Sequence, residues 1–210
     1  MNEFQKQTVF LRGWLNGRGY TTALAAMEFA RQHHTGVRKD GCTPEFQHQT
    51  EIALHASVLP GLMFPEETIA TAFLHDTVED TPVSRHEISH RFGEMISGAT
   101  WRMTKIDEAG DKRDPKMLFE DMATCPIASL SKGLDRAHNQ RTMGGVFAPG
   151  KMISYVEETE EYILPMLKKA RVNFPQQYAA YQLIKNTLTT QVRIVRSLIE
   201  TSPTDQREGT

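Results

Sequence analysis

The sequence predicts an all-α domain. Apolar residues recur at helical spacing in most of the longer segments, and glycine or proline separates these segments from one another. No segment shows the strict apolar–polar alternation of a half-buried strand, and the chain contains no internal repeat. We therefore expect a compact bundle of helices without a sheet.

Turn residues place the predicted helices along the chain. Their expected ranges are residues 4–15, 23–33, 48–59, 65–80, 84–92, 94–102, 116–123, 126–142, 151–170 and 176–199. Thr21 or Thr22 is expected to cap the second helix, and Ser84 with Glu87 forms a capping box. Two polar loops interrupt the pattern, over residues 34–47 and 103–115. The second is either a mobile lid over a site or a simple surface loop.

The composition fits one globular domain. The chain has 210 residues, of which 39% are hydrophobic and 24% charged, which suffices to bury a core. We expect a single domain over residues 1–200 and a polar, disordered tail over residues 201–210. The formal net charge of −2 provides no overall basic field for nucleic acid.

The cysteines and the hydropathy pattern predict a cytoplasmic protein. Cys42 and Cys125 are far apart and form no CxxC pair, which fits a reducing compartment and argues against a zinc–thiolate site. No apolar run approaches the ~20 residues that span a bilayer. The N-terminus also lacks the basic-then-apolar pattern of a signal peptide. We expect no membrane contact, and the oligomeric state stays open.

The stretch TAFLHDTVEDTP, residues 71–82, carries the strongest chemical signal. His75 and Glu79 are four residues apart, as are Asp76 and Asp80, so a helix would bring each pair together. Three carboxylates this close repel one another unless a cation neutralises them. An exposed acidic helix end is the alternative, but the residues before His75 are apolar. The stretch therefore favours a buried divalent metal.

Two further helices supply candidate ligands. His48 begins the predicted helix 48–59, and Asp135 lies on helix 126–142 with Asn139 four residues later on the same face. Together with His75 and Asp76, they form a set of two imidazoles and two carboxylates. Such a set suits Mn²⁺, Fe²⁺ or Zn²⁺, whereas Mg²⁺ prefers oxygen ligands.

The remaining charged groups fit hydrolysis of a phosphate ester. A bound metal lowers the pKa of water from about 15.7 toward 7. Glu79 and Asp80 are then available to orient or deprotonate that water. Arg38 and Lys39, in the loop over residues 34–47, can hold the phosphate charge, although a solvated loop tip is the alternative.

The other histidines are assigned structural roles. His86 and His90 have a spacing that can chelate a metal, but a solvated helix face is favoured because no carboxylates surround them. His138 is expected to face away from Asp135 and to be a supporting or structural residue. His55 is expected to pack below the site.

With these residues assembled, the chain resembles the hydrolase domain of the Rel/SpoT-type alarmone enzymes, and most closely a small, stand-alone alarmone hydrolase of the HD superfamily. The resemblance runs from about Ala23 to Thr142. It is carried by HTGVRKDGCTPEFQH, AFLHDTVEDT, FGEMISGATWRMTKI and LDRAHNQRT. The dipeptide His-Asp alone is a weak signal, whereas the ordered combination of these motifs is specific.

The resemblance implies an HD-domain bundle around one metal ion, usually Mn²⁺. The implied reaction removes pyrophosphate from the 3′ position of ppGpp or pppGpp and leaves GDP or GTP. The family pattern assigns metal binding to His48, His75, Asp76 and Asp135, water activation to Glu79 and Asp80, and substrate contacts to Arg38, Lys39 and Asn139.

Some positions depart from the family pattern. Val37 replaces a common glutamine and Gln49 a frequent proline, and neither is expected to contact the metal. Arg102 and Met103 replace a usual Gly-Val, which could alter the substrate pocket, and the region after residue 150 matches only loosely. The chain has no room for a synthetase domain, so we expect it to degrade alarmones. The alternatives are hydrolysis of (p)ppApp or of the 2′-phosphate of NADPH, or an antitoxin-type partner of an alarmone synthetase.

Overall fold

The computed structural model describes residues 1–200 and confirms the all-α prediction. Within these residues every regular element is a helix, and β-type pairing is limited to the isolated bridges Val37–Pro44 and Ile106–Lys112. In the same range, no helix combines the length and the apolar character that crossing a membrane requires. The predicted tail over residues 201–210 lies outside the described residues.

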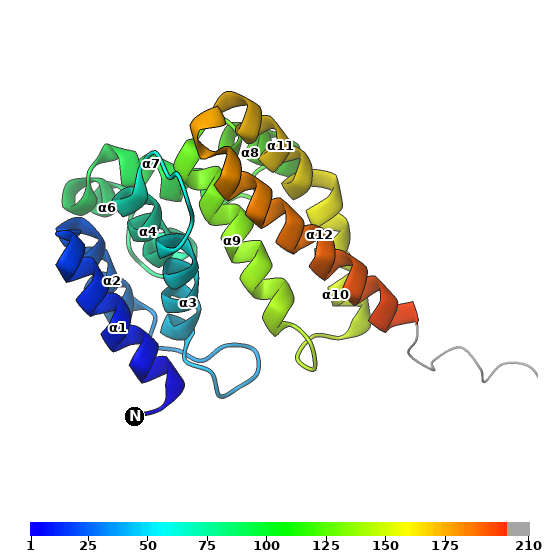
Figure 1. Cartoon of the computed structure of the whole chain (residues 1–210), viewed down its shortest axis with the longest axis horizontal. Coiled ribbons are helices and arrows are strands. Elements are labelled where there is room, and N and C mark those ends of the chain that lie inside the picture. Colours follow the sequence, from blue (N-terminus) through cyan, green and yellow to red (C-terminus); the bar gives the residue numbers. More distant parts are fainter. Residues whose placement is uncertain (201–210) are drawn as a thin grey trace, which may run out of the picture.

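The helices follow one another along the chain in the predicted order (Figure 1). They are α1 (Glu3–Arg18), α2 (Thr21–His33), α3 (Glu45–Ser57), α4 (Pro65–Leu74), α5 (Thr77–Asp80), α6 (Arg85–Phe92), α7 (Glu94–Met103), α8 (Pro115–Met122), α9 (Pro126–Thr142), α10 (Pro149–Glu158), α11 (Leu164–Asn173) and α12 (Tyr178–Glu200). A π-helical turn, Thr159–Ile163, links α10 to α11, and a 3₁₀ turn, Pro175–Gln177, precedes α12.

Helix α9 is the central element of the bundle (Figure 1). It contacts α3, α4 and α7 from the N-terminal part of the chain and α11 and α12 from the C-terminal part. Helix α4 is buried at every residue from Thr68 to Leu74, as expected of a helix enclosed by its neighbours. Because α3, α4 and α9 pack against one another, the segments that carry the candidate ligands are neighbours in space.

The predicted helix over residues 65–80 is interrupted at His75 and Asp76. Helix α4 ends at Leu74, Asp76 has φ −98° and ψ −3°, and the short helix α5 starts at Thr77. The backbone amides of Glu79 and Asp80 donate to the carbonyl oxygen of Asp76 at 3.1 and 2.8 Å. The prediction of one continuous helix was therefore wrong here. The apolar pattern upstream gives no local signal for the break, since no glycine or proline marks it.

Helix α2 begins without the predicted threonine cap. Its N-cap residue is Tyr20, which offers no side-chain hydrogen bond. Glu66 of α4 instead accepts hydrogen bonds from the backbone amides of Thr22 at 2.7 Å and Ala23 at 3.2 Å. A carboxylate distant in sequence thus satisfies the free amides of this helix and complements its dipole.

The predicted helix over residues 151–170 is also divided. Helix α10 ends at Glu158, and the π-helical turn precedes α11, which has Pro165 in its first turn. Proline lacks an amide hydrogen and its ring crowds the carbonyl four residues earlier. A π-helical turn is a usual accommodation of such a disturbance.

Gly133 is expected to be required for the packing of α9. A Cβ atom at this position would lie 2.7 Å from Cγ2 of Ile184 and 3.2 Å from Cδ2 of Leu167. We predict that Gly133→Ala lowers the free energy of unfolding by about 1–3 kcal/mol, the usual cost of overpacking a core. Gly13→Ala in α1 is the matched control, because its Cβ would meet nothing within 4 Å. Chemical denaturation should show an unchanged or higher stability for the control, by up to about 1 kcal/mol. Equal effects of both substitutions would contradict the prediction.

Candidate metal centre and active site

The packing of α3, α4 and α9 brings the four candidate ligands together. His48 lies in the first turns of α3, His75 follows the end of α4, Asp76 precedes α5, and Asp135 lies in the middle of α9. His48, His75 and Asp135 are buried, and Asp76 is half-buried. Residues from three segments that are far apart in the sequence thus face one small region.

The separations between the donor atoms fit a shared cation. Asp76 Oδ2 lies 3.1 Å from His75 Nε2 and 3.8 Å from His48 Nε2. Asp135 Oδ1 lies 3.4 Å from His48 Nε2 and 3.7 Å from His75 Nε2. Ligands that bind a divalent metal at about 2.0–2.2 Å lie roughly 3–3.5 Å from one another. Three of the four ligands, His48, His75 and Asp76, have donor atoms that all lie within 4.8 Å of one another. Asp135 approaches both imidazoles from α9.

The imidazole of His75 is oriented to bind a cation. Its Nδ1 atom lies 2.9 Å from the carbonyl oxygen of Ala72, which only accepts, so Nδ1 carries a hydrogen. Its Nε2 atom is buried and has no hydrogen-bond partner. Burial lowers the pKa of His75, but the carboxylates of Asp76 and Asp135 outweigh burial and raise it to about 10. A divalent metal would replace the extra proton and satisfy the nitrogen and both carboxylates. The residues present therefore fit a metal.

Asp135 is held by two donors on its own helix. Lys132 Nζ donates to Oδ2 at 2.9 Å, and Asn139 Nδ2 donates to Oδ1 at 2.6 Å. Arg38 Nη2 in turn donates to Asn139 Oδ1 at 2.8 Å, which links the loop over residues 34–47 to α9. Burial favours the neutral acid, but the Lys132 ammonium and the two imidazoles hold the pKa of Asp135 well below its usual value. Sequence reasoning did not select Lys132, although its i,i+3 spacing from Asp135 is a usable signal.

Glu79 and Asp80 lie in the same cavity but in different surroundings. This cavity of about 420 Å³ is also lined by His48, Asp76 and Asp135. Glu79 Oε1 lies 3.4 Å from Lys105 Nζ, and the backbone amide of Lys105 donates to Glu79 Oε2 at 3.1 Å.

Asp80 has no ion-pair partner in the part of the chain that the structure describes. Partial desolvation in the cavity, and then the negative charges of Asp76 and Glu79, raise the pKa of Asp80 to about 6. A carboxylate with such a pKa is a better proton acceptor near neutral pH than an ordinary aspartate. Glu79, by contrast, is anchored by Lys105, a residue of the polar loop over residues 103–115 that lines the cavity.

The basic end of the cavity contains more groups than the sequence indicated. Arg38 and Lys39 line the cavity together with Phe147 and Tyr155. Lys39 Nζ lies 5.5 Å from the centre of the Phe147 ring, and Lys151 Nζ lies 4.7 Å from the same centre. The neighbouring Lys151 lowers the pKa of Lys39. Phe147 and Lys151 follow the residues that carry the family motifs, so no motif pointed to them.

The structure places His138 at the site, contrary to the prediction that it faces away. Its Nδ1 atom lies 2.9 Å from Nδ1 of His48. A separation of three residues corresponds to about 60° around a helix, so His138 and Asp135 share one side of α9. The predicted supporting position agrees with this contact.

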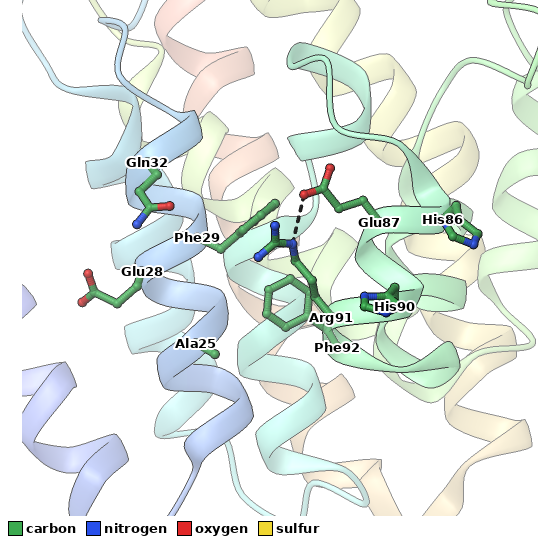
Figure 2. Close-up of a pocket in the computed structure, with 9 residues that line it drawn as sticks. All are labelled: Ala25, Glu28, Phe29, Gln32, His86, Glu87, His90, Arg91 and Phe92. Carbon is green, nitrogen blue, oxygen red and sulfur yellow. Dashed lines mark hydrogen bonds and ion pairs between the residues drawn. The ribbon is translucent and has the colours of Figure 1, made fainter.

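A larger groove lies elsewhere and contains none of the candidate site residues. Figure 2 shows this groove of about 900 Å³ between α2 and α6, where Phe29 and Phe92 face Arg91 and Glu87. His86 and His90 are exposed at its edge, in agreement with the predicted solvated face. Among the described residues, the metal-binding geometry occurs at His48, His75 and Asp76 and not in this groove. We therefore assign the chemistry to the smaller, polar cavity.

Comparison with known proteins identifies the domain. Residues 26–120 match the model of the HD domain family. This range includes His48, His75, Asp76, Glu79 and Asp80, whereas Asp135 lies beyond it.

Curated relatives match over a longer part of the chain. It is 32% identical over 148 residues to the GTP pyrophosphokinase rsh of Brucella suis biovar 1, covering 67% of this chain and 19% of the relative. It is 32% identical over 151 residues to the guanosine-3′,5′-bis(diphosphate) 3′-pyrophosphohydrolase of Aquifex aeolicus, covering 70% of this chain and 21% of the relative. The chain thus spans about a fifth of the length of these relatives.

A solved structure shows the same fold. It is a metazoan ortholog of SpoT, described as hydrolysing ppGpp and playing a role in starvation responses. The TM-score is 0.61 at 21% identity, and the match covers 82% of this chain and 94% of the other. The family match, the curated relatives and this structure thus agree with the sequence motifs and with the helical bundle. Residues 26–120 thus match the HD domain family, and the chain is similar to enzymes of the Rel/SpoT type.

Proposed function

We propose that this protein is a metal-dependent hydrolase that removes the 3′-pyrophosphate of ppGpp and pppGpp. The observation that supports this most directly is the convergence of His48, Asp76 and Asp135, two further carboxylates and a basic rim on one cavity, with His75 buried next to Asp76. The names of the relatives support the choice of substrate. In the proposed reaction the bond between the 3′ oxygen and phosphorus breaks, and water supplies the oxygen that joins the released pyrophosphate.

His48, His75, Asp76 and Asp135 would hold the metal, and we propose Mn²⁺ as the ion. Two imidazoles and two carboxylates suit this ion, since it accepts both nitrogen and oxygen donors. When bound, such a metal lowers the pKa of water and neutralises charge on the phosphoryl oxygens. Lys132 and Asn139 keep the Asp135 carboxylate in one orientation through their hydrogen bonds.

The remaining residues act either on the attacking water or on the substrate. We assign Asp80 as the acceptor of the proton from the attacking water, because its pKa of about 6 suits a base at neutral pH. Glu79, fixed by Lys105, orients that water. Arg38 and Lys39 neutralise substrate phosphates, and Asn139 places Arg38 next to the Asp135 carboxylate.

The same proposal covers the setting of the reaction. One domain over residues 1–200 carries all the assigned residues, and its proposed partner is the small nucleotide substrate. We place the activity in the cytoplasm, a reducing compartment that suits the free cysteines Cys42 and Cys125. No role for nucleic acid or membrane enters the proposal.

The first experiment tests the reaction itself. Protein stripped of metal with EDTA is incubated with ppGpp, with and without Mn²⁺, and the products are separated. We expect GDP and pyrophosphate in the presence of Mn²⁺ and neither without it. No turnover by protein that has bound Mn²⁺ would contradict the proposal. Orthophosphate released from NADPH, or turnover of adenosine alarmones alone, would favour the related-nucleotide alternatives.

A further inference from the structure

A chain of three side chains extends from the metal centre into the protein. His48 Nδ1 lies 2.9 Å from His138 Nδ1, and His138 Nε2 lies 3.0 Å from Glu51 Oε2. Glu51 also accepts a hydrogen bond from Gln47 at 2.8 Å and pairs with Arg141. His48 and His138 are both buried, with 3% of their surface exposed. The proton positions along this chain are therefore determined by these contacts.

The carboxylate of Glu51 determines which nitrogen of each imidazole carries the hydrogen. The hydrogen bond from His138, outweighing partial burial, lowers the pKa of Glu51 to about 2, so this group is ionised and only accepts. His138 must then carry its hydrogen on Nε2. In a neutral imidazole the other nitrogen, Nδ1, is an acceptor. The hydrogen between the two facing Nδ1 atoms therefore belongs to His48, whose Nε2 is left with a free lone pair.

That lone pair points at the proposed metal position. His48 Nε2 lies 3.4 Å from Asp135 Oδ1 and 3.8 Å from Asp76 Oδ2. The opposite tautomer of His48 would place a hydrogen there and could not bind a cation. We propose that His138 and Glu51 are positioning residues that hold His48 in the tautomer and orientation that bind the metal. This proposal rests on the proposed metal centre. Neither residue touches the substrate or the metal in this proposal.

The expected effect is on metal affinity. Loss of an outer partner of a metal-bound histidine usually reduces metal affinity about 10–100-fold. His138→Ala should weaken Mn²⁺ binding within that range, because His48 Nδ1 loses its acceptor. Glu51→Gln keeps the size of the side chain but removes its charge, so we expect a loss of about tenfold.

A second cavity allows a chemical rescue of the alanine variant. This cavity of about 220 Å³ lies between α3, α9 and α12, and His138 lines both it and the active-site cavity. It reaches the protein surface, since Val58 and Leu183 on its wall are 73% and 51% exposed. Imidazole added to His138→Ala can therefore enter the space that the substitution creates and restore the acceptor for His48.

The test measures Mn²⁺ affinity by isothermal titration calorimetry on metal-free protein, for the unmodified chain and each variant. Circular dichroism verifies that each variant is folded. His55→Ala is the matched control, because His55 lines the same second cavity without bonding to His48. We expect normal affinity for His55→Ala, and recovery of at least tenfold for His138→Ala in millimolar imidazole. The unmodified chain should not respond to imidazole.

Two results would overturn the inference alone. One is a Mn²⁺ affinity of folded His138→Ala that equals that of the unmodified chain. The other is an equal Mn²⁺ affinity of Glu51→Gln together with no recovery of His138→Ala by imidazole. If His138→Ala does not fold, Glu51→Gln decides the question by itself. Absence of Mn²⁺ binding by the unmodified chain would instead overturn the proposed metal centre, and the inference with it.

Discussion

Asp76→Ala is expected to abolish hydrolysis of ppGpp. The variant should lose Mn²⁺ binding and show a rate reduced on the order of a thousandfold, which corresponds to ~4 kcal/mol of transition-state stabilisation. The physical reason is the position of this carboxylate. Its Oδ2 atom lies close to both imidazole Nε2 atoms, at 3.1 and 3.8 Å, so with Asp135 it is one of two carboxylates that link the histidines. Removing it leaves two neutral imidazoles and one carboxylate to hold the cation.

The measurement combines Mn²⁺ titration with product analysis at the Mn²⁺ concentration that saturates the unmodified chain. Asp121→Ala is a suitable control, because this aspartate pairs with Arg102 and Arg113 and does not line the active-site cavity. It should retain both binding and turnover. Protection of cells by Asp76→Ala against an alarmone synthetase would favour the antitoxin-type alternative, in which contact alone neutralises the partner. Metal-stimulated turnover by this variant in vitro would instead show that the ligand set is assigned incorrectly.

The helical bundle could be predicted because its signals are local. Helix α12, for example, has Ile184, Leu188, Val192 and Val195 on its buried side, at the spacing that the sequence displays. The capping box predicted at Ser84 is half present, since its side chain accepts from the amide of Glu87 at 3.2 Å. Periodicity and capping act over a few residues, so one sequence is sufficient to find them.

Two of the wrong predictions concern places where contacts between residues far apart in the sequence determine the structure. Glu66 caps α2 from more than forty residues away, so no inspection of Thr21 and Thr22 could reveal it. The break at His75 and Asp76 follows a helix that is buried on all sides, and no residue type marks it. Pro165 is different, because it was a visible local signal against one helix over residues 151–170.

The candidate site shows the same division. Its proposed ligands were found because their residue types and order are specific. Lys132, Lys105 and Glu51 were not found, because a lysine or glutamate acquires its role only from the partner that the fold provides. His138 was named and placed as a supporting residue, but its contact with His48 depends on the packing of α3 against α9. The outer contacts of a site are thus less visible in a sequence than its ligands.

Asp80→Asn is expected to reduce turnover strongly and to raise the stability of the metal-free protein. As the proposed base, Asp80 acts when ionised, so the activity of the unmodified enzyme should fall as the pH drops below about 6. A bound cation offsets the charge of Asp76, so it can shift this fall in activity only to lower pH. The variant has no base at this position, so its residual activity should not fall in this pH range.

The stability effect has the opposite sign because the pKa of Asp80 is raised above its ordinary value of 3.8 to about 6. The folded protein binds the Asp80 proton more tightly than the unfolded chain does. This contribution to stability is fully present below pH ~4 and is lost as the pH rises through about 6. At pH 7 the ionised carboxylate is partly desolvated and faces the charges of Asp76 and Glu79, whereas an asparagine carries no charge.

Denaturation of metal-free protein should therefore give a higher midpoint for Asp80→Asn than for the unmodified chain at pH 7, with the difference shrinking toward pH 4. Glu79→Gln is the contrasting variant, since it loses the ion pair with Lys105 at 3.4 Å and should gain no stability. Unchanged turnover in Asp80→Asn would remove it as the base. Equal midpoints at pH 7 would show that desolvation and neighbouring charges do not disfavour its ionised form. A group that costs stability when ionised and is needed in that form for turnover is expected at an active site rather than in a structural ion pair.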